Sequence, residues 1–222
     1  MASEKQLEEI YQRRFSEDIQ FRQRMWKLLC REFFQKYIPT NSTVLELAAG
    51  YCEFINNIQA GRKIAVDLNS EVVNYADKDV QVTVTSTTNM AAIPDHSVNI
   101  AFTSNFFEHL TRDEIVQTIR EVRRILVKGG QFLVLQPNIR FCQQDYWMFF
   151  DHITPLDDRS LSEALETNGF KIKQTIVRFL PYTTKSRLPK GLFLIKAYLK
   201  IPLAWRFLGQ QSFIVAQVTD QA

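Results

Sequence analysis

Two acidic residues follow short apolar stretches in the first third of the chain, with a spacing that suits one shared ligand. Glu46 lies within the apolar residues 43–47 and is followed by small residues that include Ala48 and Gly50. A turn of small residues lets a ligand approach the backbone closely. Some way further on, Asp67 ends residues 63–67, where a carboxylate can accept hydrogen bonds from both hydroxyls of a ribose. The pattern therefore indicates a site for an adenosine-type cofactor.

Glu46 and Asp67 can share one ligand only if their strands lie in one sheet with their ends close together. Short runs rich in β-branched and aromatic residues alternate with helical patterns, which is typical of βαβ units around a parallel sheet. We expect helices in most gaps and strands at residues 43–47, 63–67, 80–84, 98–102, 131–136, 170–179 and 212–218.

Helix boundaries can be predicted from capping residues. Thr111 and Glu114 form a capping box, and the helix that they open is expected to stop at residues 128–130, Lys-Gly-Gly. Ser160 is the expected N-cap of a second helix that ends at residues 168–169, Asn-Gly. Before the first strand, the sequence predicts two helices over residues 3–37, with Ser3 and Ser16 as N-cap candidates.

From about residue 43 to residue 218 the chain resembles the class I S-adenosylmethionine-dependent methyltransferases. Several motifs in the family's order carry the resemblance: residues 46–52, Asp67, residues 93–99, residues 104–110 and residues 122–130. Ala48 and Cys52 stand where the family has glycine, and Thr87 and Thr88 where it usually has an acidic residue.

The resemblance implies an α/β fold with a Rossmann-like seven-stranded sheet in the order 3-2-1-4-5-7-6 and helices on both faces. Residues 1–40 would form an N-terminal helical cap, and residues 41–222 the S-adenosylmethionine-binding domain.

The same resemblance implies which residues hold the cofactor. Glu46 and the backbone at Ala48 and Gly50 would face the methionine end, and Asp67 would hold the ribose. The remaining expected contacts are Leu68 and Met90 beside the adenine, Thr88 at its edge, and Asn105 near the methionine moiety and the sulfonium. A positively charged sulfur requires carboxylates and carbonyls around it rather than cations.

Methyl transfer is an in-line displacement, so positioning should supply most of the rate, and a hydroxyl acceptor also needs a base. Of the three histidines, His96 lies in a polar turn and is expected to be exposed. His109 follows the fourth strand and is predicted either to orient the site or to pack locally. His152 lies in a loop that the family commonly uses for substrate. We predict that His152 is the general base, with Asp151 as its orienting carboxylate or as an alternative base.

Composition limits the remaining possibilities. Cys30, Cys52 and Cys142 form no Cys-x-x-Cys pair, so we expect free thiols and predict no metal site. Residues 1–170 hold 18 basic and 23 acidic residues, whereas residues 171–209 hold 9 basic residues and no acidic one. The sequence has no apolar stretch of the signal-peptide type, so we expect a cytoplasmic protein.

The basic region includes an insertion at residues 180–211, between the last two strands. In the family's sheet this connection emerges at the carboxyl ends of the strands, so it should overhang the acceptor site. Residues 192–201 predict a helix that Pro202 ends or kinks. The basic and apolar residues 185–206 suit either a lid that packs on the domain or a contact with anionic lipid at the inner membrane face.

Three classes of function remain open at this point. The resemblance favours an O-methyltransferase that acts on a small molecule, a sugar or a lipid-linked glycan. The basic segment alone favours a nucleic-acid methyltransferase, although residues 104–107 lack an Asn-Pro-Pro-Tyr type motif. The third class is a non-catalytic S-adenosylmethionine-binding module, or a nicotinamide oxidoreductase on a related sheet, although the Tyr-x-x-x-Lys dyad that a short-chain reductase needs is missing after the fifth strand.

Overall fold

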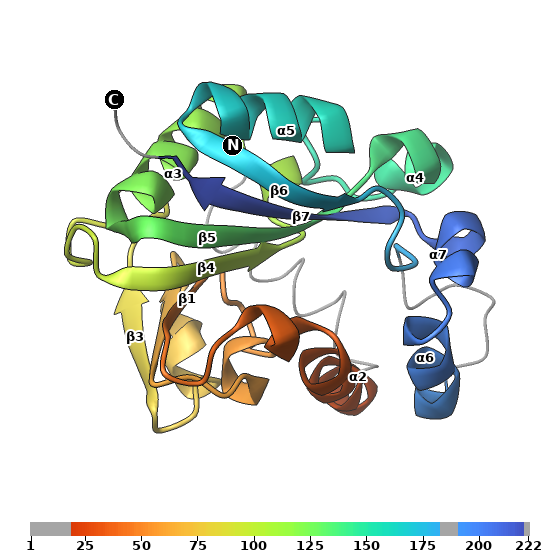
Figure 1. The fold of residues 1–222 in the computed structure, drawn as a ribbon, viewed down its shortest axis with the longest axis horizontal. Helices are drawn as coiled ribbons and strands as arrows, with labels where there is room; N and C mark the ends of the chain where they lie inside the picture. The colour runs from red at the N-terminus through yellow and green to blue at the C-terminus, as the bar shows by residue number, and fades with distance from the viewer. Residues whose placement is uncertain (1–18, 183–190, 220–222) are drawn as a thin grey trace.

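The computed structural model describes residues 19–182 and 191–219, and its strands form a single sheet (Figure 1). The strand order is β3-β2-β1-β4-β5-β7-β6, which is the order implied by the resemblance. β7 runs antiparallel to β5 and β6, and the other neighbouring strands are parallel. The strands are β1 (Thr43–Leu47), β2 (Arg62–Asp67), β3 (Val80–Val84), β4 (Val98–Ser104), β5 (Leu126–Pro137), β6 (Phe170–Ile176) and β7 (Gln211–Val218).

The helices flank this sheet, but they are fewer in its first half than expected. The gaps after β1 and β2 contain only short 3-10 turns, because residues such as Asn56, Asn57 and Gly61 are poor helix formers. The expectation of helices in most gaps is therefore wrong for that half. The helices are α2 (Ile19–Glu32), α3 (Arg112–Ile125), α4 (Ile139–Tyr146), α5 (Asp158–Thr167), α6 (Leu192–Leu199) and α7 (Pro202–Leu208), and the 3-10 turns are η1 (Phe34–Tyr37), η2 (Ile55–Asn57), η3 (Ser70–Asn74) and η4 (Phe107–His109).

The capping predictions are partly confirmed. Thr111 caps α3, and both reciprocal hydrogen bonds of its capping box with Glu114 are present. α3 ends at Ile125, earlier than expected, because the Lys-Gly-Gly segment is already part of β5. The N-cap of α5 is Asp157 and not Ser160, since the Asp157 carboxylate accepts from the backbone of Arg159 and Ser160. Ser3 and Ser16, with the first predicted helix, lie outside the described residues.

Each face of the sheet has its own hydrophobic core. On one face α2, η1 and η2 pack against β1, β4, β5 and β7, and α6 adds Leu199. On the other face α3 and α5 cover the same strands, because neighbouring residues such as Val44 and Leu45 point to opposite sides. This arrangement leaves the carboxyl ends of the strands free to carry polar groups.

The connection between β6 and β7 contains two short helices, of which α6 lies beside α2 (Figure 1). Lys196 of α6 lies 3.9 Å from the carboxylate of Glu32 in α2. Pro202 ends the first of the two helices, as predicted, and occupies the first turn of α7. Among the described residues no helix is both long enough and apolar enough to cross a lipid bilayer.

Candidate functional site

The ends of β1 and β2 are joined through the carboxylate of Asp67. The backbone N–H of Gly50 donates to Asp67 Oδ2 at 2.8 Å, and the N–H of Asn69 donates to Oδ1 at 2.8 Å. Glu46 is buried beneath this loop and accepts from the backbone of Ile55 at 3.0 Å. Burial raises the pKa of both carboxyls, that of Glu46 well above its usual range. The two acids predicted from sequence are therefore brought to one edge of the sheet.

The loop between them keeps the backbone of a glycine-rich turn although two of its glycines are replaced. Ala48, Gly50 and Cys52 all have positive φ angles, of 51°, 51° and 54°. Such angles strain a residue with a Cβ atom, and strained residues cluster at ligand sites. A Cβ atom built on Gly50 would meet no heavy atom within 4 Å. The space beside Gly50 is therefore open to a ligand.

The three residues predicted near the adenine occupy different environments. Leu68 is 55% exposed just after β2, as expected of a residue that packs on a flat ring. The hydroxyls of Thr88 and Ser86 lie 2.7 Å apart in a hydrogen bond. Met90 is fully buried in the core beneath α3, and its N–H donates to the carboxylate of Glu121. The Met90 side chain contributes to the core in this conformation, and its contact with adenine stays a prediction.

Asn105 follows β4 at the same edge of the sheet. Its φ angle is 49°, and its backbone N–H donates to Leu135 at 2.9 Å. Its side-chain oxygen Oδ1 is buried with no hydrogen-bond partner. A buried acceptor without a donor is costly unless a ligand completes it. The acceptor atoms of Glu46, Asp67 and Asn105 suit a cationic ligand such as a sulfonium, so the residues present fit the cofactor that the resemblance implies.

A second polar cluster is formed by residues of η4 and of the loop after α4. Glu108 Oε1 is 4.0 Å from His109 Nε2 and 4.0 Å from His152 Nε2. Asp151 Oδ2 lies 3.2 Å from His109 Nδ1, and Tyr182 Oη lies 3.4 Å from His152 Nε2. The sequence predicted Asp151 as the orienting partner of His152, whereas the structure places the Asp151 carboxylate against His109. The predicted histidines therefore meet around a glutamate that the sequence analysis did not select.

Glu108 is the central residue of this cluster. Its side chain is 1% exposed, and burial raises the pKa of its carboxyl. Gln136 of β5 donates from Nε2 to Glu108 Oε2 at 2.9 Å. The motif at residues 104–110 contained Glu108, but nothing in a single sequence indicated which residues this carboxylate would face.

Backbone hydrogen bonds hold the loop that carries His152 against η4. The N–H groups of Ile153 and Thr154 both donate to the carbonyl oxygen of Glu108, at 2.9 and 3.2 Å. The Tyr146 hydroxyl donates to the carbonyl of Thr154. The position of His152 therefore depends on hydrogen bonds made by the backbone of its neighbours.

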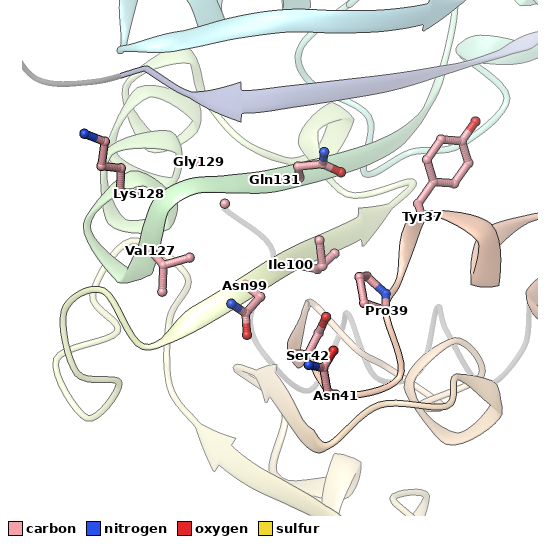
Figure 2. A pocket seen from close by; sticks show the side chains of 11 residues that line it. Tyr37, Pro39, Asn41, Ser42, Asn99, Ile100, Val127, Lys128, Gly129 and Gln131 are labelled. Carbon is pink, nitrogen blue, oxygen red and sulfur yellow. The ribbon is translucent and has the colours of Figure 1, made fainter.

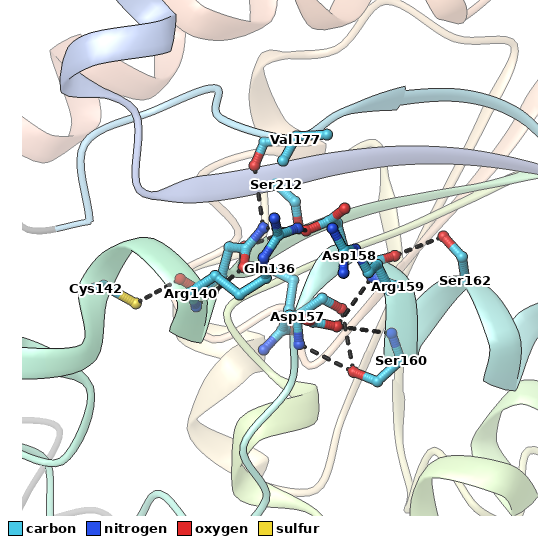
Figure 3. Close-up of polar contacts among 11 residues, drawn as sticks. Gln136, Arg140, Cys142, Asp157, Asp158, Arg159, Ser160, Ser162, Val177 and Ser212 are labelled. Atoms are coloured by element: carbon cyan, nitrogen blue, oxygen red, sulfur yellow. Dashed lines mark hydrogen bonds and ion pairs between the residues drawn. The ribbon is translucent and has the colours of Figure 1, made fainter.

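The helices on either side of that loop are tied to each other (Figure 3). Arg140 of α4 and Asp158 of α5 form an ion pair at 2.8 Å, and Asn138 donates to the same carboxylate at 2.7 Å. The loop that carries His152 is thus fixed at both ends.

A groove of about 400 Å³ lies at the opposite edge of the sheet (Figure 2). It is lined by Asn41 and Asn99, at or near the amino ends of β1 and β4, and by Gln131 with residues 127–130 in the first half of β5. Gly50 and Asp67 lie at the carboxyl ends, so this groove is not the predicted cofactor site.

Comparisons with known proteins agree with this fold. Residues 45–134 match the family model described as a methyltransferase domain. A probable S-adenosylmethionine-dependent methyltransferase of Mycolicibacterium smegmatis is 36% identical over 86 residues, which are 38% of this chain and 33% of that protein. The match thus spans about a third of the length of that relative.

Two solved structures are similar over most of their length. A SAM-dependent methyltransferase from Archaeoglobus fulgidus superposes with a TM-score of 0.67 at 17% identity, covering 91% of this chain and 98% of that one. A SAM-dependent methyltransferase of Thermotoga maritima, described as a possible histamine N-methyltransferase, gives 0.64 at 18% identity, covering 94% and 98%. At these identities the likeness concerns the fold.

Fold and sequence motif together define the class. Residues 45–134 match a methyltransferase domain, and the strand order is that of the class I, S-adenosylmethionine-dependent methyltransferase fold, as the resemblance implied. S-adenosylmethionine is the cofactor of that family.

Proposed function

We propose that this protein transfers the methyl group of S-adenosylmethionine to a hydroxyl group of an acceptor. The observation that carries the proposal is the set of acceptor atoms at the carboxyl ends of β1, β2 and β4. Asp67 would hold the ribose, while the buried Asn105 Oδ1 and the Glu46 carboxylate would face the positive end of the cofactor. When bound, S-adenosylmethionine supplies a methyl group on a positively charged sulfur.

The cluster at Glu108 supports a hydroxyl acceptor, because a hydroxyl must lose its proton. In the proposed reaction the acceptor O–H bond breaks, a C–O bond forms, and the bond between the methyl carbon and sulfur breaks to leave S-adenosylhomocysteine. His152 is the proposed base, and the released proton then passes to solvent. Asp151 accepts from His109 Nδ1 and thereby orients the His109 ring. We therefore propose that His109 and Asp151 assist His152 in the reaction.

The acceptor class that we propose is a small molecule, a sugar or a lipid-linked glycan. Support comes from α6 and α7, whose side chains Phe193, Leu203 and Phe207 are 79%, 62% and 74% exposed. The charged residues of these helices are basic, namely Lys196 and Arg206, and Lys200 lies between the helices. Apolar and basic side chains together favour an interface with anionic lipid. Lys185, Arg187 and Lys190, which the sequence analysis added to this surface, lie outside the described residues.

The cofactor assignment is tested by calorimetry with S-adenosylmethionine and S-adenosylhomocysteine. Asp67→Asn should weaken binding of both by about tenfold or more, because it removes a charged acceptor from the ribose hydroxyls. Asp113→Asn, at an exposed carboxylate in the first turn of α3, is the matched control and should bind as the wild type does. Equal affinities in all three proteins would remove Asp67 from the site.

The reaction is tested by a screen of cell extracts and defined glycans for products that gain a methyl group, as resolved by mass spectrometry. Products that appear only with nucleic acid would favour the nucleic-acid methyltransferase. Cofactor binding without any methylated product in the screen would favour the non-catalytic module.

A further inference from the structure

We infer that Glu108, His109 and His152 bind one divalent transition-metal ion. The ligand atoms that the three residues offer all lie within 4.8 Å of one another. No metal site was predicted from the sequence, because the cysteines form no ligand pattern and the three residues come from separate segments, η4 and the loop after α4.

The charges of the cluster favour a cation. Glu108 is a fully buried carboxylate, and its ion-pair partners among the described residues are the two imidazoles. A buried charge is costly unless it is paired or coordinates a metal. Two imidazole nitrogens and one carboxylate oxygen form a donor set typical of zinc, iron, cobalt and manganese.

The groups behind the ligands are arranged as they are around metal sites. His109 Nδ1 lies 3.2 Å from Asp151 Oδ2 and 3.1 Å from the carbonyl oxygen of Asp151, so its N–H is directed there and Nε2 is directed at Glu108. Gln136 donates to Glu108 Oε2, which leaves Oε1 for the cluster. In metal sites a ligating histidine usually donates its other ring N–H to a carboxylate, and a ligating carboxylate usually accepts a further hydrogen bond.

The geometry requires a small contraction. Ligand atoms at about 2.1 Å from a shared ion lie roughly 3.0–3.5 Å apart. The distances of 4.0 Å from Glu108 Oε1 to each imidazole would therefore shorten by about 0.5–1 Å, and the two imidazole nitrogens, which lie within 4.8 Å of each other, would also move closer. His152 Nε2 would turn from the Tyr182 hydroxyl, 3.4 Å away, to the ion.

The role of the ion in catalysis rests on the proposed function. Binding of the ion at the site does not depend on that function. Three protein ligands leave positions for an acceptor oxygen, and a bound cation lowers the pKa of a coordinated hydroxyl. His152 would then act as a ligand in place of a free base, and the acceptor proton would leave to water.

Metal content is measured by equilibrium dialysis of the full chain against Co²⁺, Mn²⁺ and Zn²⁺ separately, followed by mass spectrometry of the metal. Wild type should bind one ion per chain, and the Co²⁺ form should show visible absorption of a protein-bound ion. Glu108→Gln and His152→Gln should each lower the affinity more than tenfold. Asp151→Asn should weaken binding about 10- to 100-fold while the ion remains bound at saturation.

His96→Gln is the matched control, since His96 is the histidine outside the cluster, in the turn before β4. It should bind metal as the wild type does. S-adenosylmethionine calorimetry checks that each variant is folded. Wild type that binds the cofactor but none of the three ions, or cluster variants that bind metal as the control does, would overturn the metal site and leave the methyltransferase proposal intact. Metal binding without cofactor binding would support the metal site and overturn the methyltransferase proposal.

Discussion

At the scale of single residues, the loop after β1 has the backbone conformation of a glycine-rich turn, although two of its positions are not glycine. Ala48 and Cys52 adopt the left-handed φ angles that glycine would adopt without strain. The side chain of Cys52 is fully buried, so it also contributes to the core. The substitutions therefore cost local strain but leave the shape of the loop available to a ligand.

Two substitutions in this loop should have opposite effects on stability. Ala48→Gly should leave the free energy of unfolding unchanged or raise it by up to about 1 kcal/mol, because it relieves the positive φ angle at some cost in chain entropy. Gly50→Ala should lower it by about 1–2 kcal/mol. Gly50→Ala should also weaken S-adenosylmethionine binding, since its methyl group enters the open space beside the loop. Urea denaturation and calorimetry measure these quantities, and destabilisation by both substitutions would contradict the strain argument.

The three cysteines should be unreactive in the folded protein. All three thiols are buried and free. Burial raises the pKa of the Cys52 and Cys142 thiols to about 12 and that of Cys30 well above its ordinary value. A raised thiol pKa lowers the fraction of reactive thiolate at every lower pH. At pH 8 iodoacetamide should modify the native protein slowly and the urea-unfolded protein at all three positions, as counted by mass spectrometry. Rapid native labelling at pH 8 would show that the thiols are accessible.

At the scale of elements, helix starts hold the chain segments near the site. α3 begins directly after η4, which carries Glu108 and His109. Its capping box satisfies backbone donors at Thr111 and Glu114. A well-defined start of α3 therefore limits the movement of the acidic and histidine residues that precede it.

Thr111→Ala should lower the free energy of unfolding by about 1 kcal/mol, because it removes the side-chain cap of α3. Thr167→Ala is the matched control. Its hydroxyl donates to carbonyls in the last turn of α5, and its loss should change stability by less than about 0.5 kcal/mol. Both values come from urea denaturation. A loss at Thr111 no larger than that at Thr167 would mean that the capping box contributes little.

At the scale of the whole molecule, α6 and α7 extend the apolar surface beyond the core. Leu199 of α6 packs into the core, whereas Phe193 and Phe207 remain exposed. Exposed apolar surface of this kind supports the proposed contact with an apolar partner. In that proposal the basic charges of α6 and α7 would favour an anionic surface.

Flotation with vesicles tests the proposed membrane contact. The protein should float with vesicles that contain phosphatidylserine and less with pure phosphatidylcholine. Phe193→Ser with Phe207→Ser should reduce the floated fraction severalfold. Val73→Ser, at a residue of η3 that is 54% exposed, is the matched control and should float as the wild type does. Failure of the wild type to float would favour a lid packed on the domain.

The sequence by itself located the strands and the ends of β1 and β2, and the family resemblance implied the strand order. Patterns of apolar residues and caps act over a few neighbours, so residues 43–47 and 80–84 were located with their observed limits. Once the strand order is known, Gly50 and Asp67 are expected to lie close together, because the carboxyl ends of neighbouring parallel strands lie at one edge of the sheet.

Only the tertiary structure decided which side chains surround Glu108. His152 is distant in sequence and reaches Glu108 because its loop neighbours donate to the Glu108 carbonyl. The burial of Met90 beneath α3 is likewise a tertiary feature, and its predicted contact with adenine stays a prediction. Contacts of this kind depend on the conformation of loops between distant elements. Residue type and local spacing do not predict that conformation.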